Sequence, residues 1–185
     1  MNKHLLATAI TAAFLTAACS PAASEQKTAA ASAPPAAAKT AQQLRAQCTG
    51  GFQSLQQQAS AGNAQSQAEL GWCYGQGVGT QKDEKRAAEL YQQSAAQGNA
   101  SGKNGLAYMY FMGKGGLQKD EARWLELTQQ AAGQGSPVAH YNLGVAYEKG
   151  LGGLQKDEAR AVELYRKAAE LGDDSAPAAL GLMYV

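Results

Sequence analysis

The sequence predicts an all-α fold, an α/α superhelix (solenoid) in which helix pairs stack in chain order. The first observation is a repeat: the stretch from Leu143 to Gly172 occurs three times, and its lysines Lys82, Lys119 and Lys156 stand 37 residues apart. The second is that each copy joins two apolar patterns of helical spacing through a glycine-rich connection. A period of roughly 20 to 50 residues is typical of arrays of small supersecondary units.

The first half of each copy predicts a helix that ends at glycines. Leu143, Gly144 and Tyr147 fall at i, i+1 and i+4, so they share one face of a helix. Gly150 then begins a glycine-rich stretch, which suits a tight turn with positive φ.

The second half predicts a capped helix. Asp157 stands where a side chain accepts hydrogen bonds from the first unpaired N–H groups, and Glu158 follows where a negative charge complements the helix dipole. Gly172 marks the C-terminal end. The inward face carries small and apolar residues at helical spacing: Ala161, Leu164, Tyr165, Ala168 and Ala169.

This pattern resembles the Sel-one-like repeat, a relative of the tetratricopeptide repeat. In the last full copy the matching residues are Leu143, Gly144, Tyr147, Gly150, Asp157, Ala168, Ala169 and Gly172. The middle copy matches at Leu106, Tyr110, Gly113, Asp120, Ala131, Ala132 and Gly135, with Ala107 in place of the glycine. The earliest copy matches at Leu70, Gly71, Tyr74, Gly77, Asp83, Ala95, Ala96 and Gly98. The resemblance implies a right-handed superhelix of helix pairs.

The chain divides into three regions. Residues 1–18 read as a lipoprotein-type signal peptide, 19–40 as an Ala/Pro/Ser tether that buries too little apolar surface to fold, and 41–185 as the repeat domain. We expect units at about 64–98, 100–135 and 137–172, a partial unit at 176–185, and a Gln-rich N-terminal cap at about 41–62. The apolar partial unit has two interpretations: a truncated chain, or a final helix that needs a partner.

The N-terminus predicts export and lipid attachment. Leu15-Thr16-Ala17-Ala18-Cys19 resembles the lipobox of bacterial lipoproteins, in which the cysteine sulfur is acylated. The resemblance implies an outer-membrane lipoprotein facing the periplasm, held at the membrane through the lipid anchor only. An ordinary secretory signal, giving a soluble periplasmic or secreted protein, is the alternative.

The other two cysteines form a candidate disulfide. In an oxidising compartment Cys48 and Cys73 are free to pair. Helix rises counted from the turn at Gly62 place them at heights about 6 Å apart, near the upper limit for a disulfide. Two small buried hydrophobic residues are the alternative.

Composition argues against nucleic acid and against catalysis. Beyond residue 40, 13 Lys and Arg face 14 Asp and Glu, so no basic stripe for nucleic acid is visible. His140 is the single histidine there, which excludes a two-histidine metal site, and we predict no metal, cofactor or catalytic residue. A penicillin-binding or β-lactamase-like, peptidoglycan-related enzyme remains the alternative, because some cysteine-rich relatives carry that description. Inhibition or immunity is a third possibility.

The class we predict is a protein-binding or peptide-binding scaffold, because stacked helix pairs create an extended curved surface. The candidate surface lies on the first helix of each unit, turned away from the Leu-Gly-Tyr face. It comprises Glu69, Trp72, Gln76, Tyr108, Met112, Asn142 and Lys149. Aromatic side chains on such a face are typical anchors for a peptide. The alternative is that Trp72 and Tyr108 pack between adjacent units.

Overall fold

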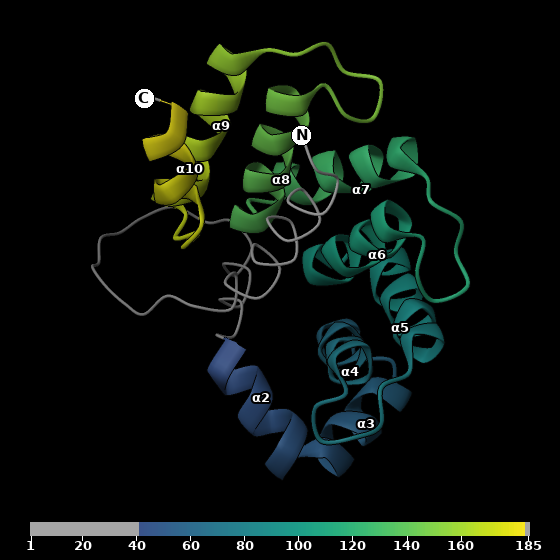
Figure 1. Cartoon of the computed structure of the whole chain (residues 1–185). Coiled ribbons are helices and arrows are strands. Elements are labelled where there is room, and N and C mark those ends of the chain that lie inside the picture. The colour runs from purple at the N-terminus through teal and green to yellow at the C-terminus, as the bar shows by residue number, and fades with distance from the viewer. Residues whose placement is uncertain (1–40, 184–185) are drawn as a thin grey trace, which may run out of the picture.

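The computed structural model describes residues 41–183, and this part of the chain is entirely helical apart from its connections (Figure 1). The helices are α2 (Ala41–Gly50), α3 (Phe52–Ser60), α4 (Ala64–Gln76), α5 (Glu84–Ala96), α6 (Ala100–Met112), α7 (Glu121–Gly133), α8 (Pro137–Lys149), α9 (Glu158–Glu170) and α10 (Ala176–Met183). The all-α prediction is confirmed. The signal peptide, Cys19 and the tether lie outside the described residues.

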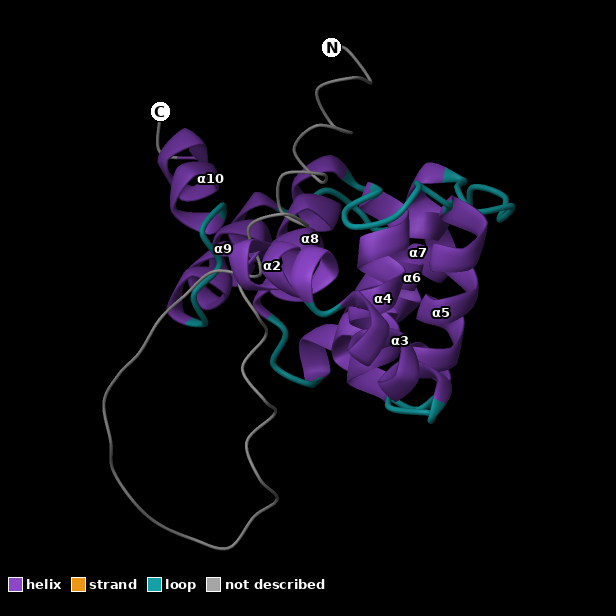
Figure 2. Ribbon diagram, turned by 90° about the horizontal axis from the view of Figure 1, so that it is seen from below, coloured by secondary structure: helices purple, strands orange, loops and turns teal. Residues whose placement is uncertain are grey.

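The helices follow one another along an arc. Three pairs, α4 with α5, α6 with α7 and α8 with α9, stack in chain order, with α2 and α3 before them and α10 after them. Figure 1 shows α4, α6 and α8 on the inner side of the arc and α5, α7 and α9 on the outer side, and Figure 2 shows the connecting loops at the ends of the helices. Contacts are made mainly between consecutive helices. The described part is therefore a solenoid.

Side-chain caps fix where the helices begin. Asp83, Asp120 and Asp157 each accept a hydrogen bond, 2.9 Å long, from the backbone N–H three residues later. This confirms the predicted role of the aspartates at the start of α5, α7 and α9. Asn63 and Asn99 cap α4 and α6 in the same way, at 2.8 and 2.9 Å. Each cap satisfies one of the N–H groups that a helix start leaves unpaired.

Glycines on the inner helices make room for tyrosine rings from the outer helices. A Cβ on Gly144 would lie 2.6 Å from the ring of Tyr165, and one on Gly71 would lie 3.0 Å from the ring of Tyr91. Tyr91 also packs on the next pair, since a Cβ on Gly105 would lie 2.3 Å from its ring. One tyrosine therefore joins its own pair to the following one.

The middle pair, α6 with α7, lacks this contact between a glycine and a tyrosine ring. Ala107 stands where its neighbours have Gly71 and Gly144, and Thr128 stands where they have tyrosine. Trp124, at the repeat position of Ala87 and Ala161, is 0% exposed, and its ring centroid lies 4.9 Å from that of Phe111. Because all three changes fall in one core, we expect the added methyl group, the lost phenol ring and the added indole to be coupled.

Within residues 41–183, no helix combines the length and the apolar character needed to cross a bilayer.

Candidate partner-binding surface

The predicted binding residues come from the three inner helices and occupy three equivalent positions in the repeat. Glu69, Trp72 and Gln76 lie on α4 at i, i+3 and i+7, which is one stripe of a helix. The same stripe carries Tyr108 and Met112 on α6, and Asn142 and Lys149 on α8. It points away from Gly71 and Gly144, which face the outer helix of their own pair.

The first position of the stripe belongs to the packing between pairs. Glu69 is 4% exposed and Asn142 is 1% exposed. The residue at this position on α6 is Gly105, which receives the ring of Tyr91 from the preceding pair. A ligand on the surface does not reach these two side chains without a rearrangement of the helices.

The residues at the second position of the stripe differ in burial from pair to pair. Trp72 is 7% exposed and belongs to the core that surrounds α4, and Val145, its equivalent on α8, is 4% exposed. Tyr108 is half-buried and packs against two core clusters, one with residues from α2 to α6 and the other with residues from α6 to α10. The structure thus favours the packing interpretation for Trp72, while part of Tyr108 remains accessible.

The third position supplies the exposed side chains. Gln76 and Lys149 are exposed and Met112 is half-buried. Gln76 presents an amide, Lys149 an ammonium group and Met112 a thioether, and Tyr108 adds a phenol ring. We define these four residues, Gln76, Tyr108, Met112 and Lys149, as the inner surface.

Lys114 extends this surface, and the sequence reasoning missed it. Its Nζ lies 5.5 Å from the ring centroid of Tyr108 and 3.3 Å from a carboxylate oxygen of Glu84 on the preceding pair. Burial opposes its charge, but Tyr108 and Glu84 outweigh burial, so the pKa of Lys114 is raised. One feature of the sequence could have identified Lys114 as unusual: it occupies the repeat position at which the other two copies have the apolar residues Val78 and Leu151.

Glu84 forms ion pairs with two lysines, Lys114 and Lys82. A hydrogen bond from Lys82, 2.7 Å away, lowers the pKa of the Glu84 carboxyl against the effect of burial, and Lys114 lowers it further. Glu148 plays a comparable part on α8, where it accepts a 2.6 Å hydrogen bond from the hydroxyl of Tyr165 and pairs with Lys149. The charged groups near the inner surface are therefore held by partners of opposite sign.

Two buried amides leave acceptor oxygens without a hydrogen-bond partner within the described residues. They are the Oδ1 atoms of Asn104 and Asn142. The Nδ2 of Asn104 donates to Ser136 Oγ at 2.8 Å, which joins α6 to the cap of α8. These contacts lie inside the stack, so they bear on stability.

His140 belongs to no cluster of metal-ligating side chains in the described part of the chain. Its Nδ1 lies 2.8 Å from the carbonyl oxygen of Ser136, the residue that caps the start of α8. Residues 41–183 contain no group of three or more His, Cys, Asp and Glu side chains that could hold a metal ion.

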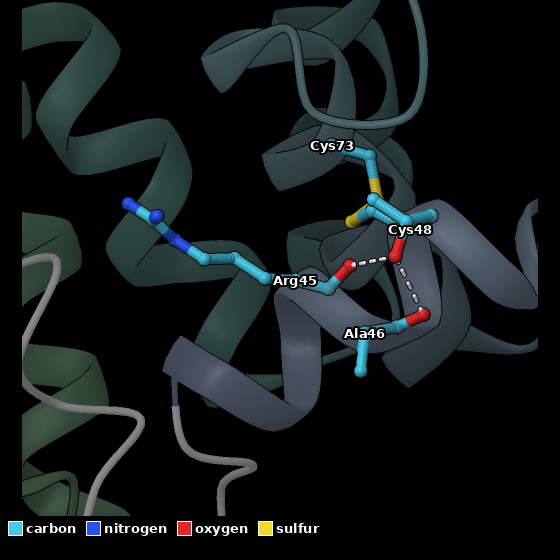
Figure 3. The surroundings of a disulfide bond; sticks show 5 residues. Arg45, Ala46, Cys48 and Cys73 are labelled. Carbon is cyan, nitrogen blue, oxygen red and sulfur yellow. Dashed lines mark hydrogen bonds between the residues drawn. A yellow bond between two sulfur atoms is a disulfide. The ribbon is translucent and has the colours of Figure 1, made fainter.

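A disulfide joins the N-terminal cap to the first pair (Figure 3). Cys48 on α2 and Cys73 on α4 have Cα atoms 5.7 Å apart, inside the usual range, and both side chains are 0% exposed. The side chain of Arg45 points away from the bond in Figure 3. The α4–α5 connection packs closely here, because a Cβ on Gly79 would overlap the carbonyl of Cys48 at 1.8 Å.

A surface cleft of about 670 Å³ lies at the same connection. Arg86 stacks over the ring of Tyr74 there, 4.8 Å from its centroid. The lining residues are Tyr74, Thr80, Gln81, Lys82, Asp83, Glu84 and Arg86, and none of the predicted binding residues is among them.

Comparison with known proteins gives concordant results. The model of the Sel1 repeat matches residues 64–99, 100–136 and 137–173. A Sel1 repeat protein from Oxalobacter formigenes is 35% identical, with 71% of this chain and 97% of that chain covered and a TM-score of 0.59. No curated protein shows a significant match.

Two further solved structures share the fold. Protein c5321, a protective antigen present in uropathogenic Escherichia coli strains and displaying an SLR fold, is 29% identical with a TM-score of 0.64. The match covers 80% of this chain but only 30% of that one. Helicobacter pylori cysteine rich protein B is 19% identical over 74% of this chain and 96% of that chain, with a TM-score of 0.54, a likeness of fold alone. With three matched copies that cover more than half of its residues, the chain belongs to the Sel1 repeat family.

Proposed function

We propose that the protein is a scaffold that binds a protein or peptide of the bacterial cell envelope on its inner surface, and that a lipid on Cys19 tethers it to the outer membrane. The binding part of this proposal is supported by the helix-pair stack, and the tether by the sequence alone.

The observation that carries the binding proposal is the contrast between constant and variable positions in the repeat. The helix caps keep their residue type from copy to copy, since Asp83, Asp120 and Asp157 each cap the second helix of a pair. The exposed third position of the stripe changes completely, from Gln76 to Met112 to Lys149. A helix-pair framework that is kept from copy to copy, with a changing inner face, is what a repeat scaffold needs to recognise one particular partner.

The mixed chemistry of the inner surface favours a polypeptide as the ligand. Tyr108 and Met112 offer partly exposed apolar area, and Lys149 and Lys114 offer positive charge at its border. Aromatic and methionine side chains are enriched at the cores of protein interfaces, with charged groups at the rim. A peptide with an apolar side chain beside a carboxylate fits this arrangement.

Crosslinking in envelope membranes tests the binding site. We expect Tyr108→Ala and, separately, Lys149→Glu to reduce the yield of a specific crosslinked partner about tenfold, while Gln129→Ala, at an exposed position on the outer helix α7, leaves it unchanged. Lys149 is exposed, so its substitution spares the core and separates binding from folding. If both inner variants capture the same partner at full yield, the inner surface is not the binding site.

Lipid labelling tests the tether independently. Cells fed a labelled fatty acid should incorporate the label into the parent protein, and the Cys19→Ser variant should carry none. A parent chain without label would remove the anchor and leave the soluble periplasmic or secreted alternative, with no effect on the binding proposal.

A further inference from the structure

The connection between α4 and α5 is one residue shorter than the equivalent connections of the other two pairs. A single residue, Thr80, stands where those connections have Gly116-Leu117 and Gly153-Leu154. Both leucines are half-buried and pack against the core clusters. The first connection thus has a hydroxyl in place of a leucine, and the cleft of about 670 Å³ lies beside it.

Contacts at several points hold this connection in place. The backbone N–H of Asp83 donates to the carbonyl oxygen of Tyr74 at 2.9 Å. Gly79 lies directly against the backbone of Cys48, where a Cβ would overlap the carbonyl oxygen, and the disulfide fixes Cys48 to Cys73 on α4. The walls of the cleft are therefore in position without a ligand, which lowers the entropic cost of binding one.

The guanidinium of Arg86 lies over an aromatic ring in this cleft. Its distance from the ring centroid of Tyr74 is 4.8 Å. Tyr74 is only 6% exposed, and an edge contact with Phe52, with 5.7 Å between the ring centroids, supports its ring. An arginine stacked on a fixed ring keeps the N–H groups at its edge available to an acceptor.

Arg123 holds the equivalent position in the middle pair and forms an ion pair instead. Its Nη1 lies 3.3 Å from a carboxylate oxygen of Glu126. Arg86 has Glu89 at the same spacing, yet within residues 41–183 its guanidinium forms no ion pair and no hydrogen bond. Arg86 is therefore a cation of the cleft that no carboxylate of the described chain pairs with.

The other charged groups of the cleft have partners. A carboxylate oxygen of Glu84 lies 2.7 Å from Nζ of Lys82 and 3.3 Å from Nζ of Lys114. Asp83 accepts the capping hydrogen bond from the backbone N–H of Arg86. The lining carries two positive and two negative side chains, so it is neutral as a whole and favours a ligand with one negative charge over a dianion.

We propose that this cleft binds a small carboxylate ligand of the size of a dipeptide, whose carboxylate accepts two hydrogen bonds from the guanidinium of Arg86. A planar carboxylate matches the fork of N–H groups on arginine. Thr80 and Gln81 make no hydrogen bond with the described part of the chain, so their hydroxyl and amide are available to the peptide group behind the carboxylate.

The size of the cleft agrees with such a ligand. Its volume of about 670 Å³ lies within the range of about 300–1,000 Å³ that is typical of small-molecule sites. The cleft uses none of the four residues of the inner surface, so it is independent of the function proposed above.

The probe is N-acetyl-alanyl-alanine, titrated into the isotope-labelled full chain and followed by NMR through the backbone amide signals of Thr80 and Gln81. We expect saturable shifts with a Kd of about 1 mM or below. The same dipeptide with a C-terminal amide should bind at least about tenfold more weakly, because it offers no charged acceptor to the guanidinium. Inorganic phosphate should also bind more weakly than the dipeptide, because the lining is neutral.

The decisive variant is Arg86→Gln. Arg86 is exposed, so the fold should be kept, while affinity for the dipeptide should fall about tenfold or more because the charged fork is lost. Arg160→Gln is the matched control. Arg160 holds the same repeat position and lies over Tyr147 at 5.5 Å, but its connection keeps Leu154, so this variant should leave the affinity unchanged.

A second variant tests the cleft from its other lining. Thr80→Leu returns a leucine to the shortened connection and should reduce dipeptide affinity about tenfold by filling the cleft, with the helical circular dichroism of the chain unchanged. Tyr108→Ala alters the inner surface and should have no effect on the dipeptide.

Four results would overturn the proposal. One is the absence of saturable shifts at Thr80 and Gln81. Another is equal affinity of the parent and of Arg86→Gln, or an equal loss in Arg160→Gln, which would reduce the effect to general charge. The third is equal binding of the amidated dipeptide, which would remove the carboxylate from the recognition. The fourth is tighter binding of inorganic phosphate, which would assign the cleft to a phosphate group.

Discussion

Gly144 shows how a single missing side chain sets the distance between two helices. The ring of Tyr165 lies where a Cβ would be, and Tyr165 itself is 1% exposed, so neither partner has space to move. Overpacking of this kind costs about 1–3 kcal/mol in a well-packed core.

We therefore expect Gly144→Ala to lower the free energy of unfolding by about 1–3 kcal/mol, measured by urea denaturation. Gly133→Ala is the matched control, because a Cβ at this exposed helical glycine meets nothing within 4 Å. That variant should gain up to about 1 kcal/mol from helix propensity. Equal effects at the two sites would show that Gly144 is not tightly packed against Tyr165.

Asp173 is a buried carboxylate that accepts hydrogen bonds at the start of α10. Its Oδ1 accepts from the backbone N–H groups of Ser175 and Ala176 at 2.9 and 3.0 Å, but its Oδ2 has no partner among the described residues. Burial raises the pKa of Asp173 above 3.8, and the charge of Asp174 adds to this, although the two N–H groups oppose it. Its ionisation is thus less favourable in the folded chain than in the unfolded one.

The folded chain consequently holds this proton more tightly, and the contribution of Asp173 to stability is greatest at low pH and is lost as pH rises through the raised pKa. Asp173→Asn keeps an acceptor for the cap and removes the charge. We expect it to raise the free energy of unfolding at pH 7 by on the order of 1 kcal/mol and to have little effect near pH 3. Urea denaturation at both pH values, with Glu89→Gln at an exposed position on α5 as control, measures the difference. A loss of stability at pH 7 would contradict the assigned direction.

At the scale of the element, α2 depends on one covalent bond. This helix buries Leu44 and Cys48 and leaves most of its other described side chains exposed. The bond between Cys48 and Cys73 spans 25 residues of chain and fixes α2 against α4. Cross-links of about this span limit the freedom of the unfolded chain.

Replacing both cysteines with serine should lower the free energy of unfolding by about 3 kcal/mol. Amide hydrogen exchange should show the loss first in α2. Reduction of the parent protein under native conditions should proceed slowly, because both sulfurs are buried. Unchanged exchange in α2 after the double substitution would show that α2 is held by packing alone.

The pair α6–α7 offers a second test at this scale, since its core uses a different set of side chains. Thr128→Tyr alone places a ring where Trp124 and the methyl group of Ala107 leave no room, and should cost about 1–3 kcal/mol. The triple variant Ala107→Gly, Trp124→Ala, Thr128→Tyr recreates the packing of the neighbouring pairs. We expect it to recover most of that loss, with a coupling energy of about 1–3 kcal/mol in a mutant cycle read by urea denaturation. Additive effects would mean that these positions do not share one cavity.

At the scale of the whole molecule, each helix pair contacts mainly the pairs next to it in the sequence, so we expect local stability to depend on where a pair lies in the stack. Pairs inside a solenoid have neighbours on both sides, whereas helices at its ends have one. We expect amide exchange to be slowest in α6 and α7, intermediate in α2 because of its disulfide, and fastest in α10. Uniform protection from α3 to α10 would indicate a single cooperative unit and contradict this expectation.

The sequence by itself determined the helix pairs, their order and their caps. These features are local: the positions of Gly, Asp and Ala within 37 residues dictate where a helix begins, which face is apolar and where it ends. The repeat then predicted the stack, because one copy has no other partner for its apolar face.

Only the tertiary structure decided which side chains of the predicted stripe reach the surface. Glu69, Trp72 and Asn142 share their stripe with Gln76 and Lys149, and no pattern along the chain separates them. They differ because Tyr91 and other residues of adjacent pairs lie over one end of the stripe and leave the other open. The sequence did not predict that Trp124, Thr128 and Ala107 share one core, for the same reason. Periodicity shows which face of a helix is apolar, but the burial of each residue on that face depends on the side chains that the neighbouring pair packs against it.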